Sequence, residues 1–314
     1  MNVQRLLPLC MLLFVHIASA QKIERFYNVA ATDTADNYTL VVKPTSGAPK
    51  GWVLLFPGFG EKPEDVLKET DLVARAAQAG YLVAIPYVDG NTALHISEAK
   101  IQPILRLVDN TSKKYKLKGK PLAVGGFSMG GTTAVKLTEY MLAVPTAVQE
   151  ARVSALFAVD PLLDFERFER STLKAVQRAN SAMPRRMLQM LQTMLRNDFG
   201  TTAVQTPEKF YTISPYAYAD TANTAIKPLK QLPVLFYTEP DIDNQFNSNR
   251  RDLYDLNTAD CTAMIADLQS MGNQQVQLVI TTAKGLRADG TINPHSWSIL
   301  NVDQTINWLH RFMK

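Results

Sequence analysis

The 314-residue sequence contains little cysteine and no apolar run long enough to span a membrane. Its two cysteines are Cys10 and Cys261, and Cys10 lies in a segment that we expect to be removed. The remaining chain would keep one cysteine and could form no internal disulfide. An exported protein without disulfides fits a bacterial envelope better than a eukaryotic secreted domain.

Patterns typical of metal, phosphate and nucleic-acid sites are also missing. The sequence has no His-x-x-x-His, no pair of neighbouring cysteines and no glycine-rich phosphate loop of the usual spelling. Its formal net charge of +4 is mild, and no basic run is interleaved with aromatic residues. We therefore expect no metal, no cofactor and no nucleic-acid partner.

The first twenty residues have the pattern of a cleavable signal peptide. Arg5 supplies a positive start, Leu6–Ile17 is a short apolar stretch, and Ala18–Ala20 offers small residues for cleavage. The alternative is an uncleaved membrane anchor. Cleavage would leave residues 21–314 as a single domain that is secreted or periplasmic, with no stable membrane span.

Strands and helices alternate along the rest of the chain. Fully apolar or alternating runs predict strands at 37–43, 52–56, 81–88, 121–125, 153–159, 233–237 and 276–281. Helical spacing predicts helices at 64–79, 96–115, 132–142, 258–271 and 299–312. This order predicts an α/β protein with a mostly parallel central sheet and helices on both faces.

The segment from about 162 to 230 interrupts this alternation and predicts a helical cap. Residues 165–197 should form two helices, separated near Pro184. Between Phe165 and Gly200 the chain carries seven basic and three acidic residues. It also has methionines at helical spacing: Met183, Met187, Met190 and Met194. Such a stripe either packs on the domain below or forms an adaptable lid over a substrate.

The stretch Gly126–Gly131 (GFSMGG) has the pattern of a nucleophile elbow between a strand and a helix. In such a turn the serine is held in a strained backbone conformation with its oxygen exposed. Glycines on both sides keep side chains out of the turn. The helix that follows would direct its N-terminal amides toward an oxyanion. Ser128 is therefore the candidate nucleophile.

Four pieces in order give the chain a resemblance to the α/β-hydrolase superfamily, particularly to secreted bacterial serine esterases and lipases. They are Phe56–Gly60 (FPGFG), Gly126–Gly130, an acid after the strand 233–237, and His295 after the last strand. The resemblance implies a triad of Ser128, Asp241 and His295 in that chain order. His295 would act as base and then as acid, and the carboxylate would orient its ring.

The choice of acid stays open between several carboxylates. Asp241 lies three residues after Thr238, where the family commonly carries a small residue before its acid. Asp243 and Glu239 are alternatives in the same segment. Asp160, which ends the preceding strand, is a fourth and more remote candidate.

The resemblance also implies an oxyanion hole and suggests a pocket. The backbone amides of Met129, next to the nucleophile, and of Phe59, in the loop after the strand 52–56, match the family's donors. Tyr87 and Trp297 could line the substrate pocket, although Trp297 could equally be a core aromatic.

These expectations indicate an exported serine hydrolase that cleaves carboxylic esters through an acyl-enzyme. The substrate would be a small-molecule, glycan or lipid ester. A serine peptidase or an acyltransferase of the same fold is an alternative, and so is a catalytically inactive binding module. Binding modules of this kind typically lose a triad residue, whereas this chain has all three residue types.

Overall fold

The computed structural model describes residues 22–27, 34–94, 97–144, 146, 150–179 and 182–314. The expected signal peptide at residues 1–20 lies outside this part of the chain. No helix in the described ranges is long and apolar enough to cross a membrane.

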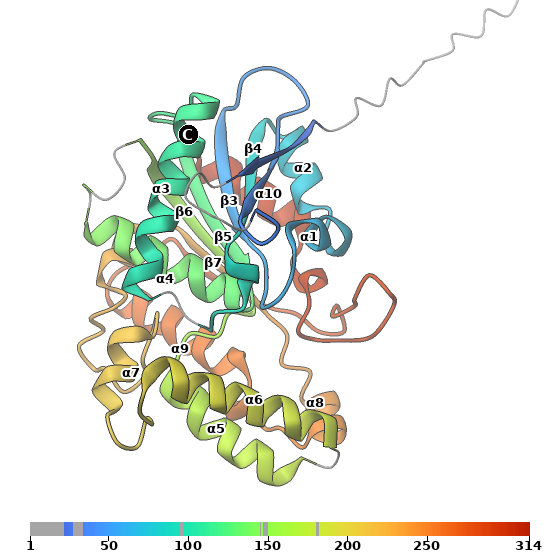
Figure 1. Ribbon diagram of the computed structural model, residues 1–314, viewed down its shortest axis with the longest axis vertical. Coiled ribbons are helices and arrows are strands. Elements are labelled where there is room, and N and C mark those ends of the chain that lie inside the picture. The colour runs from blue at the N-terminus through green and yellow to red at the C-terminus, as the bar shows by residue number, and fades with distance from the viewer. Residues whose placement is uncertain (1–21, 28–33, 95–96, 145, 147–149, 180–181) are drawn as a thin grey trace, which may run out of the picture.

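An eight-stranded, mostly parallel sheet forms the body of the protein (Figure 1), in the order β1-β2-β4-β3-β5-β6-β7-β8. β1 and β2 pair antiparallel at one edge, β2 pairs antiparallel with β4, and every pairing from β4 to β8 is parallel. The strands are β1 Ile23–Tyr27, β2 Tyr38–Val42, β3 Gly51–Phe56, β4 Tyr81–Tyr87, β5 Pro121–Phe127, β6 Arg152–Val159, β7 Val234–Thr238 and β8 Val276–Ile280. The prediction of a mostly parallel α/β sheet is confirmed.

Helices cover both faces of this sheet. The α-helices of the described residues, some of which lie beyond the sheet, are α1 Pro63–Glu69, α2 Leu72–Gln78, α3 Glu98–Tyr115, α4 Met129–Ala143, α5 Phe165–Arg178, α6 Ala182–Phe199, α7 Pro207–Ile213, α8 Ile242–Asn249, α9 Asn257–Ser270 and α10 Val302–Phe312. Side chains of α3, α4 and α9 pack on one face, and those of α1, α2 and α10 pack on the other. Because alternate residues of β3 enter the two cores, that strand is apolar along its whole length.

Several local expectations were wrong. The helix expected at 64–79 is two helices, because the chain turns extended at Thr70. No strand or helix was predicted for the particular segments that form β1, α7 and α8. These elements are short and half-exposed, so their sequences carry little periodicity.

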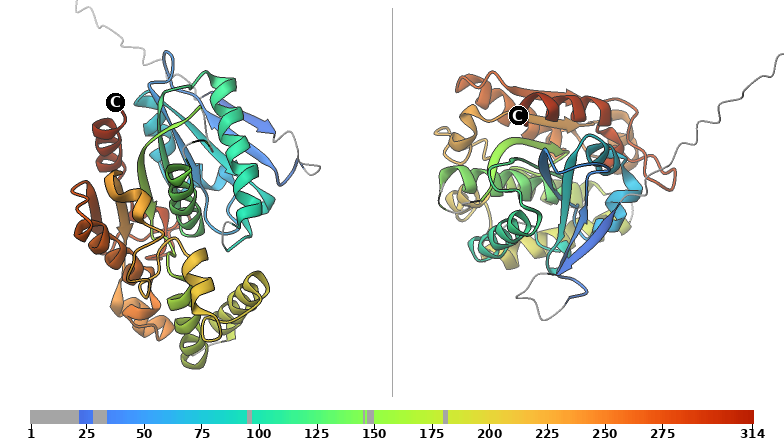
Figure 2. Two further views of the ribbon diagram at one scale, coloured as in Figure 1. Left: turned by 90° about the vertical axis from the view of Figure 1, so that its left-hand side faces the viewer. Right: turned by 90° about the horizontal axis from the view of Figure 1, so that it is seen from above.

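The segment between β6 and β7 contains α5, α6 and α7, which gather at one end of the molecule beyond the sheet (Figures 1 and 2). We call these three helices the cap. They have a small apolar core of their own, in which the rings of Phe165, Phe199 and Phe210 stack edge to face. Leu162 and Met129 join this core from the body, so the cap sits directly beside the start of α4.

Candidate active site

The predicted nucleophile lies in a strained turn between β5 and α4. Ser128 has φ 53° and ψ −123°, a backbone conformation that residues other than glycine rarely adopt. A Cβ atom at Gly126 would lie 2.4 Å from the backbone of Gly130. A Cβ at Gly130 would lie 2.2 Å from the carbonyl oxygens of Phe56 and Pro57. Glycine is therefore required at both positions, and the tight fit brings the end of β3 against the beginning of α4.

His295 meets the serine directly. Its Nε2 lies 2.8 Å from Ser128 Oγ, although the two residues are 167 positions apart in the chain. The histidine lies in the long loop after β8, where Asn293 Oδ1 accepts from its backbone N–H. Phe127 packs beside the imidazole, with ring centroids 4.7 Å apart. The structure thus brings the predicted nucleophile and base together.

The carboxylate that contacts the histidine is Asp160. Its Oδ2 lies 2.5 Å from His295 Nδ1, and its Oδ1 accepts a hydrogen bond of 2.7 Å from Thr238 Oγ1. The backbone of Asp160 is also fixed, because its N–H donates to Tyr237 O and its carbonyl accepts from Asn257 Nδ2. The residue is held from three neighbouring elements, and its side chain points at the imidazole.

The expectation that Asp241 partners His295 is therefore corrected. The register of β5 with β6 pairs Phe127 with Val159, so Ser128 and Asp160 emerge side by side from adjacent strands. Asp241 lies three residues beyond the end of β7, one strand further along the sheet, and precedes α8. Within the described residues, no hydrogen bond reaches its carboxylate.

The other two carboxylates of that segment have different surroundings. Asp243 is exposed on α8. Glu239 is buried and accepts hydrogen bonds from the backbone N–H groups of Lys284 and Gly285 and from Thr281 Oγ1. Glu239 thus holds the beginning of the loop that carries the histidine. Thr238, whose position in the sequence suggested an acid three residues later, instead supports the acid of the preceding strand.

Phe59 and Met129 both lie beside Ser128 along one cavity. Met129 is the first residue of α4, so its N–H has no acceptor within the helix. Phe59 follows Gly58, whose N–H donates 2.8 Å to Glu61 Oε2 and thereby fixes the loop. Their positions suit the two expected oxyanion donors, and that role stays a prediction.

Glu61 was not among the expected site residues, and it links three parts of the site. Besides the N–H of Gly58, its carboxylate accepts from Trp297 Nε1 at 3.1 Å and lies 3.6 Å from Arg287 Nη1. Arg287 also donates 2.7 Å to the carbonyl of His295. One carboxylate therefore ties the loop after β3 to the loop of the histidine. In the sequence, the only sign of a role for Glu61 is its place directly after the Pro57–Gly60 stretch.

Neither aromatic residue expected in the pocket lines it. Trp297 is fully buried in the core beneath α1 and α10, where it packs on Phe127. Tyr87 is 5% exposed, belongs to the same core and packs at a tilt against the ring of Tyr38. Both side chains lie in the core between the sheet and the helices α1, α2 and α10, and neither is among the residues that line the cavity.

The cavity above Ser128 has a volume of about 610 Å³, within the range of small-molecule sites. The cap supplies one wall through Phe168 of α5 and through four residues of α6: Met187, Leu188, Met190 and Leu191. Polar residues from α8, from the segment after it and from the start of α9 also line the cavity: Gln245, Asn249, Arg251, Asn257 and Thr258. Met187 and Met190 thus line the cavity that contains Ser128, whereas Met194 packs against the apolar core of the cap, so the lid interpretation of the stripe stays a prediction.

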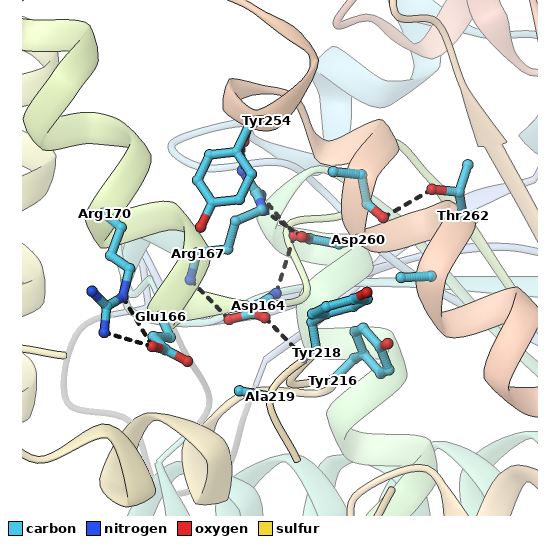
Figure 3. Close-up of a pocket in the computed structure, with 12 residues that line it drawn as sticks. Asp164, Glu166, Arg167, Arg170, Tyr216, Tyr218, Ala219, Tyr254, Asp260 and Thr262 are labelled. Atoms are coloured by element: carbon cyan, nitrogen blue, oxygen red, sulfur yellow. Dashed lines mark hydrogen bonds and ion pairs between the residues drawn. The ribbon is translucent and has the colours of Figure 1, made fainter. Parts of the chain in front are cut away.

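A second cavity, of about 670 Å³, lies between α5, α9 and the loop after α7 (Figure 3). A buried ion pair forms its floor, in which Arg167 Nη2 donates 2.7 Å to Asp260 Oδ2 and Arg167 Nη1 donates to Tyr254 O. Burial and the charge of Asp260 raise the pKa of the neighbouring Asp164 to about 6. The residues that line this cavity include no pair of nucleophile and base, so the cavity at Ser128 is the candidate active site.

Nothing in the described ranges points to a metal centre, since no cluster of three or more histidine, cysteine, aspartate or glutamate side chains is found there. The cysteine that remains after residue 20, Cys261, is buried and unpaired. Burial raises the pKa of its thiol well above the usual value, so it is a poor nucleophile.

Comparison of the sequence with protein-family models and with curated proteins finds no match. Comparison of the structure with solved structures finds many. An esterase of Pyrococcus furiosus superimposes with a TM-score of 0.55 at 14% identity, over 94% of this chain and 93% of that one. The MPT51 protein of Mycobacterium tuberculosis gives 0.59 at 11% identity, over 93% and 99%.

An esterase from the bacterial hormone-sensitive lipase family gives a TM-score of 0.57 at 15% identity, over 94% of this chain and 85% of that one. Identities this low establish the architecture alone. Together with the sheet order and the turn at Ser128, they confirm the predicted fold: the chain has the α/β-hydrolase fold.

Proposed function

We propose that the protein is a serine hydrolase that cleaves carboxylic esters, with Ser128, His295 and Asp160 as its catalytic triad. The observation that carries this proposal is the continuous chain of contacts from Asp160 Oδ2 through both imidazole nitrogens to Ser128 Oγ, at 2.5 and 2.8 Å. A serine hydroxyl becomes an effective nucleophile when a base accepts its proton during attack. Here an oriented imidazole lies at the right distance.

The reaction follows from these positions. Ser128 Oγ bonds to the ester carbonyl carbon while its proton passes to His295 Nε2, and Asp160 stabilises the imidazolium through Nδ1. The tetrahedral oxyanion would accept from the N–H groups of Met129 and Phe59. The bond to the alcohol oxygen then breaks, and that oxygen takes the proton from His295.

A water molecule completes the cycle. It attacks the acyl-enzyme as His295 accepts its proton, the carboxylic acid leaves, and the proton returns to Ser128 Oγ. The net reaction consumes only the ester and one water molecule.

The strain at Ser128 and the ester-cleaving relatives in structure favour this chemistry over an inactive binding module. A binding module would not need a serine held at φ 53°. Several structures that resemble this one are described as esterases.

A fluorophosphonate probe tests the proposal. We expect the purified protein to be labelled at Ser128, and we expect Ser128→Ala to abolish both labelling and hydrolysis of short p-nitrophenyl esters. Equal labelling of the wild type and Ser128→Ala would overturn the assignment. Hydrolysis of aminoacyl-anilides in preference to esters would indicate a peptidase instead.

We also propose that the protein is exported and that its mature chain begins at Gln21. The arrangement of Arg5, the apolar stretch and Ala18–Ala20 supports this. N-terminal sequencing of the protein recovered from a bacterial expression host would test it, since retention of Met1 on the extracted protein would contradict cleavage.

A further inference from the structure

The charged residues that line the catalytic cavity differ in whether they already have hydrogen-bond partners within the protein. Three carboxylates have such partners: Asp160 contacts His295 and Thr238, Glu239 accepts from Thr281 and two backbone amides, and Glu61 accepts from Gly58 and Trp297. The Arg287 guanidinium faces Glu61 and donates to the carbonyl of His295.

Arg251 is different. One terminal nitrogen donates to Asp255 O, while Nε is buried and has no hydrogen-bond partner in the described part of the chain. Burial lowers the pKa of this guanidinium, and the carboxylates of Asp255 and Asp160 oppose that effect. An arginine keeps its charge even so. A buried donor without an acceptor is costly, so an additional acceptor such as a water molecule or a ligand group would be favourable beside this guanidinium.

Arg251 is one of the residues that line the cavity containing Ser128. It follows α8 and lines the cavity together with the polar residues Asn249 and Asn257, whereas α6 contributes methionines and leucines to the same cavity. The cavity therefore has an apolar wall from the cap and a polar wall with a positive charge. A substrate with an apolar part and an anionic part would fit both walls at once.

We propose that Arg251 is a specificity-determining residue, and that the preferred esters carry a carboxylate or another anionic group near the scissile bond. A guanidinium binds such a group through two parallel N–H donors, and a charge-assisted hydrogen bond in a buried site is among the stronger polar contacts. This inference rests on the proposed ester hydrolysis and names its substrate class. The anionic group can lie on the acyl or on the alcohol side of the ester.

Two matched pairs of substrates distinguish these sides. For the acyl side, the mono-p-nitrophenyl ester of glutaric acid is compared with p-nitrophenyl pentanoate. For the alcohol side, 4-butyryloxybenzoate is compared with its methyl ester. The quantity measured is the ratio of kcat/KM for the charged over the neutral member of each pair, at active-site concentrations fixed by fluorophosphonate titration.

In at least one pair, we expect the wild type to prefer the charged substrate and Arg251→Gln to lower the ratio at least tenfold. Arg251→Lys, which keeps the charge but loses the fork of donors, should retain part of the preference. The neighbouring Arg250 is exposed and lies over the ring of Phe246, so Arg250→Gln is a matched control that should leave both ratios unchanged.

Two results would overturn the inference. One is the absence of any charge preference in the wild type. The other is an equal loss of activity toward charged and neutral esters in Arg251→Gln, which would make Arg251 a support for Asp160 alone. Failure of the proposed function looks different, because no ester in either pair would then be hydrolysed in a Ser128-dependent manner.

Discussion

The body and the cap contribute to the candidate active site in different ways. The proposed triad and both expected oxyanion donors come from the body, at the ends of adjacent strands or in loops that hydrogen bonds fix there. The cap supplies side chains to the cavity wall, and Met187 and Met190 are about half exposed. The body is thus built to position reacting atoms, whereas the cap is built to shape what reaches them.

The junction between the body and the cap also differs in polarity from the cores of the body. The two cores of the body are almost entirely apolar, but the junction with the cap contains the buried pair Arg167–Asp260. Asp260 also accepts from the backbone N–H groups of Leu163 and Asp164, where the chain enters α5. We expect this network of directed hydrogen bonds to favour one orientation of the cap more strongly than apolar packing alone would.

The largest expected effect concerns the acid in the body. Asp160→Asn should reduce kcat toward p-nitrophenyl butyrate by about 10³- to 10⁴-fold, because the amide would stabilise the wrong imidazole tautomer and no imidazolium. Asp241→Asn is the matched control, and it should change kcat by less than about threefold. Steady-state kinetics with active-site titration separates the two. Near wild-type kcat in Asp160→Asn would refute the triad of Ser128, His295 and Asp160.

This contrast also shows how much of the site the sequence contains. Ser128 and His295 were predictable because the turn needs glycines at fixed spacing and because few histidines follow the last strand. The acid was not, since Asp160 and Asp241 each follow a predicted strand. The choice depends on which strands are neighbours and on their register, and both are set by tertiary packing.

The cap was predictable as an interruption of the alternation and as a stripe of methionines. Its anchor was not, because Arg167 and Asp260 are 93 residues apart and each resembles a solvated helix charge in the sequence. The same holds for Glu61, whose partners come from a loop more than two hundred residues away. Long-range polar pairs leave no periodic signal in a single sequence.

A second, smaller effect is expected at the junction between body and cap. Arg167→Met removes one partner of a buried pair and leaves Asp260 uncompensated, which should lower the free energy of unfolding by about 3–5 kcal/mol. Arg170→Met is the matched control, because its pair with Glu166 is an i,i+4 contact with an exposed arginine, and it should cost about 0.5 kcal/mol. Urea denaturation measures both.

Hydrogen exchange can also show which part of the protein the Arg167→Met substitution destabilises. Hydrogen exchange should increase mainly in α5 and α6 of Arg167→Met, while β5 and β6 stay protected. If the two arginine variants are equally stable, the cap is held by its apolar core and not by the ion pair.

The smallest expected effect is a pH dependence at the same junction. The pKa of Asp164 is raised from an ordinary value of 3.8 to about 6 in the folded protein, by burial and by the charge of Asp260. Between these two values the folded protein binds more protons than the unfolded chain. Stability from this group is therefore present below about pH 4 and is lost as pH rises through 6, by at most about 3 kcal/mol.

Asp164→Asn lacks this titration and keeps an oxygen that can accept from Arg167 N–H. The free energy of unfolding of the wild type and of Asp164→Asn is measured in urea at pH 4.5 and at pH 7. Relative to the variant, the wild type should lose about 1–3 kcal/mol between the lower and the higher pH. Other titrating groups cancel in the comparison, because both proteins contain them. A difference that is the same at both pH values would mean that the carboxyl group of Asp164 is already ionised at pH 4.5 in the folded protein, in spite of its burial and of the charge of Asp260.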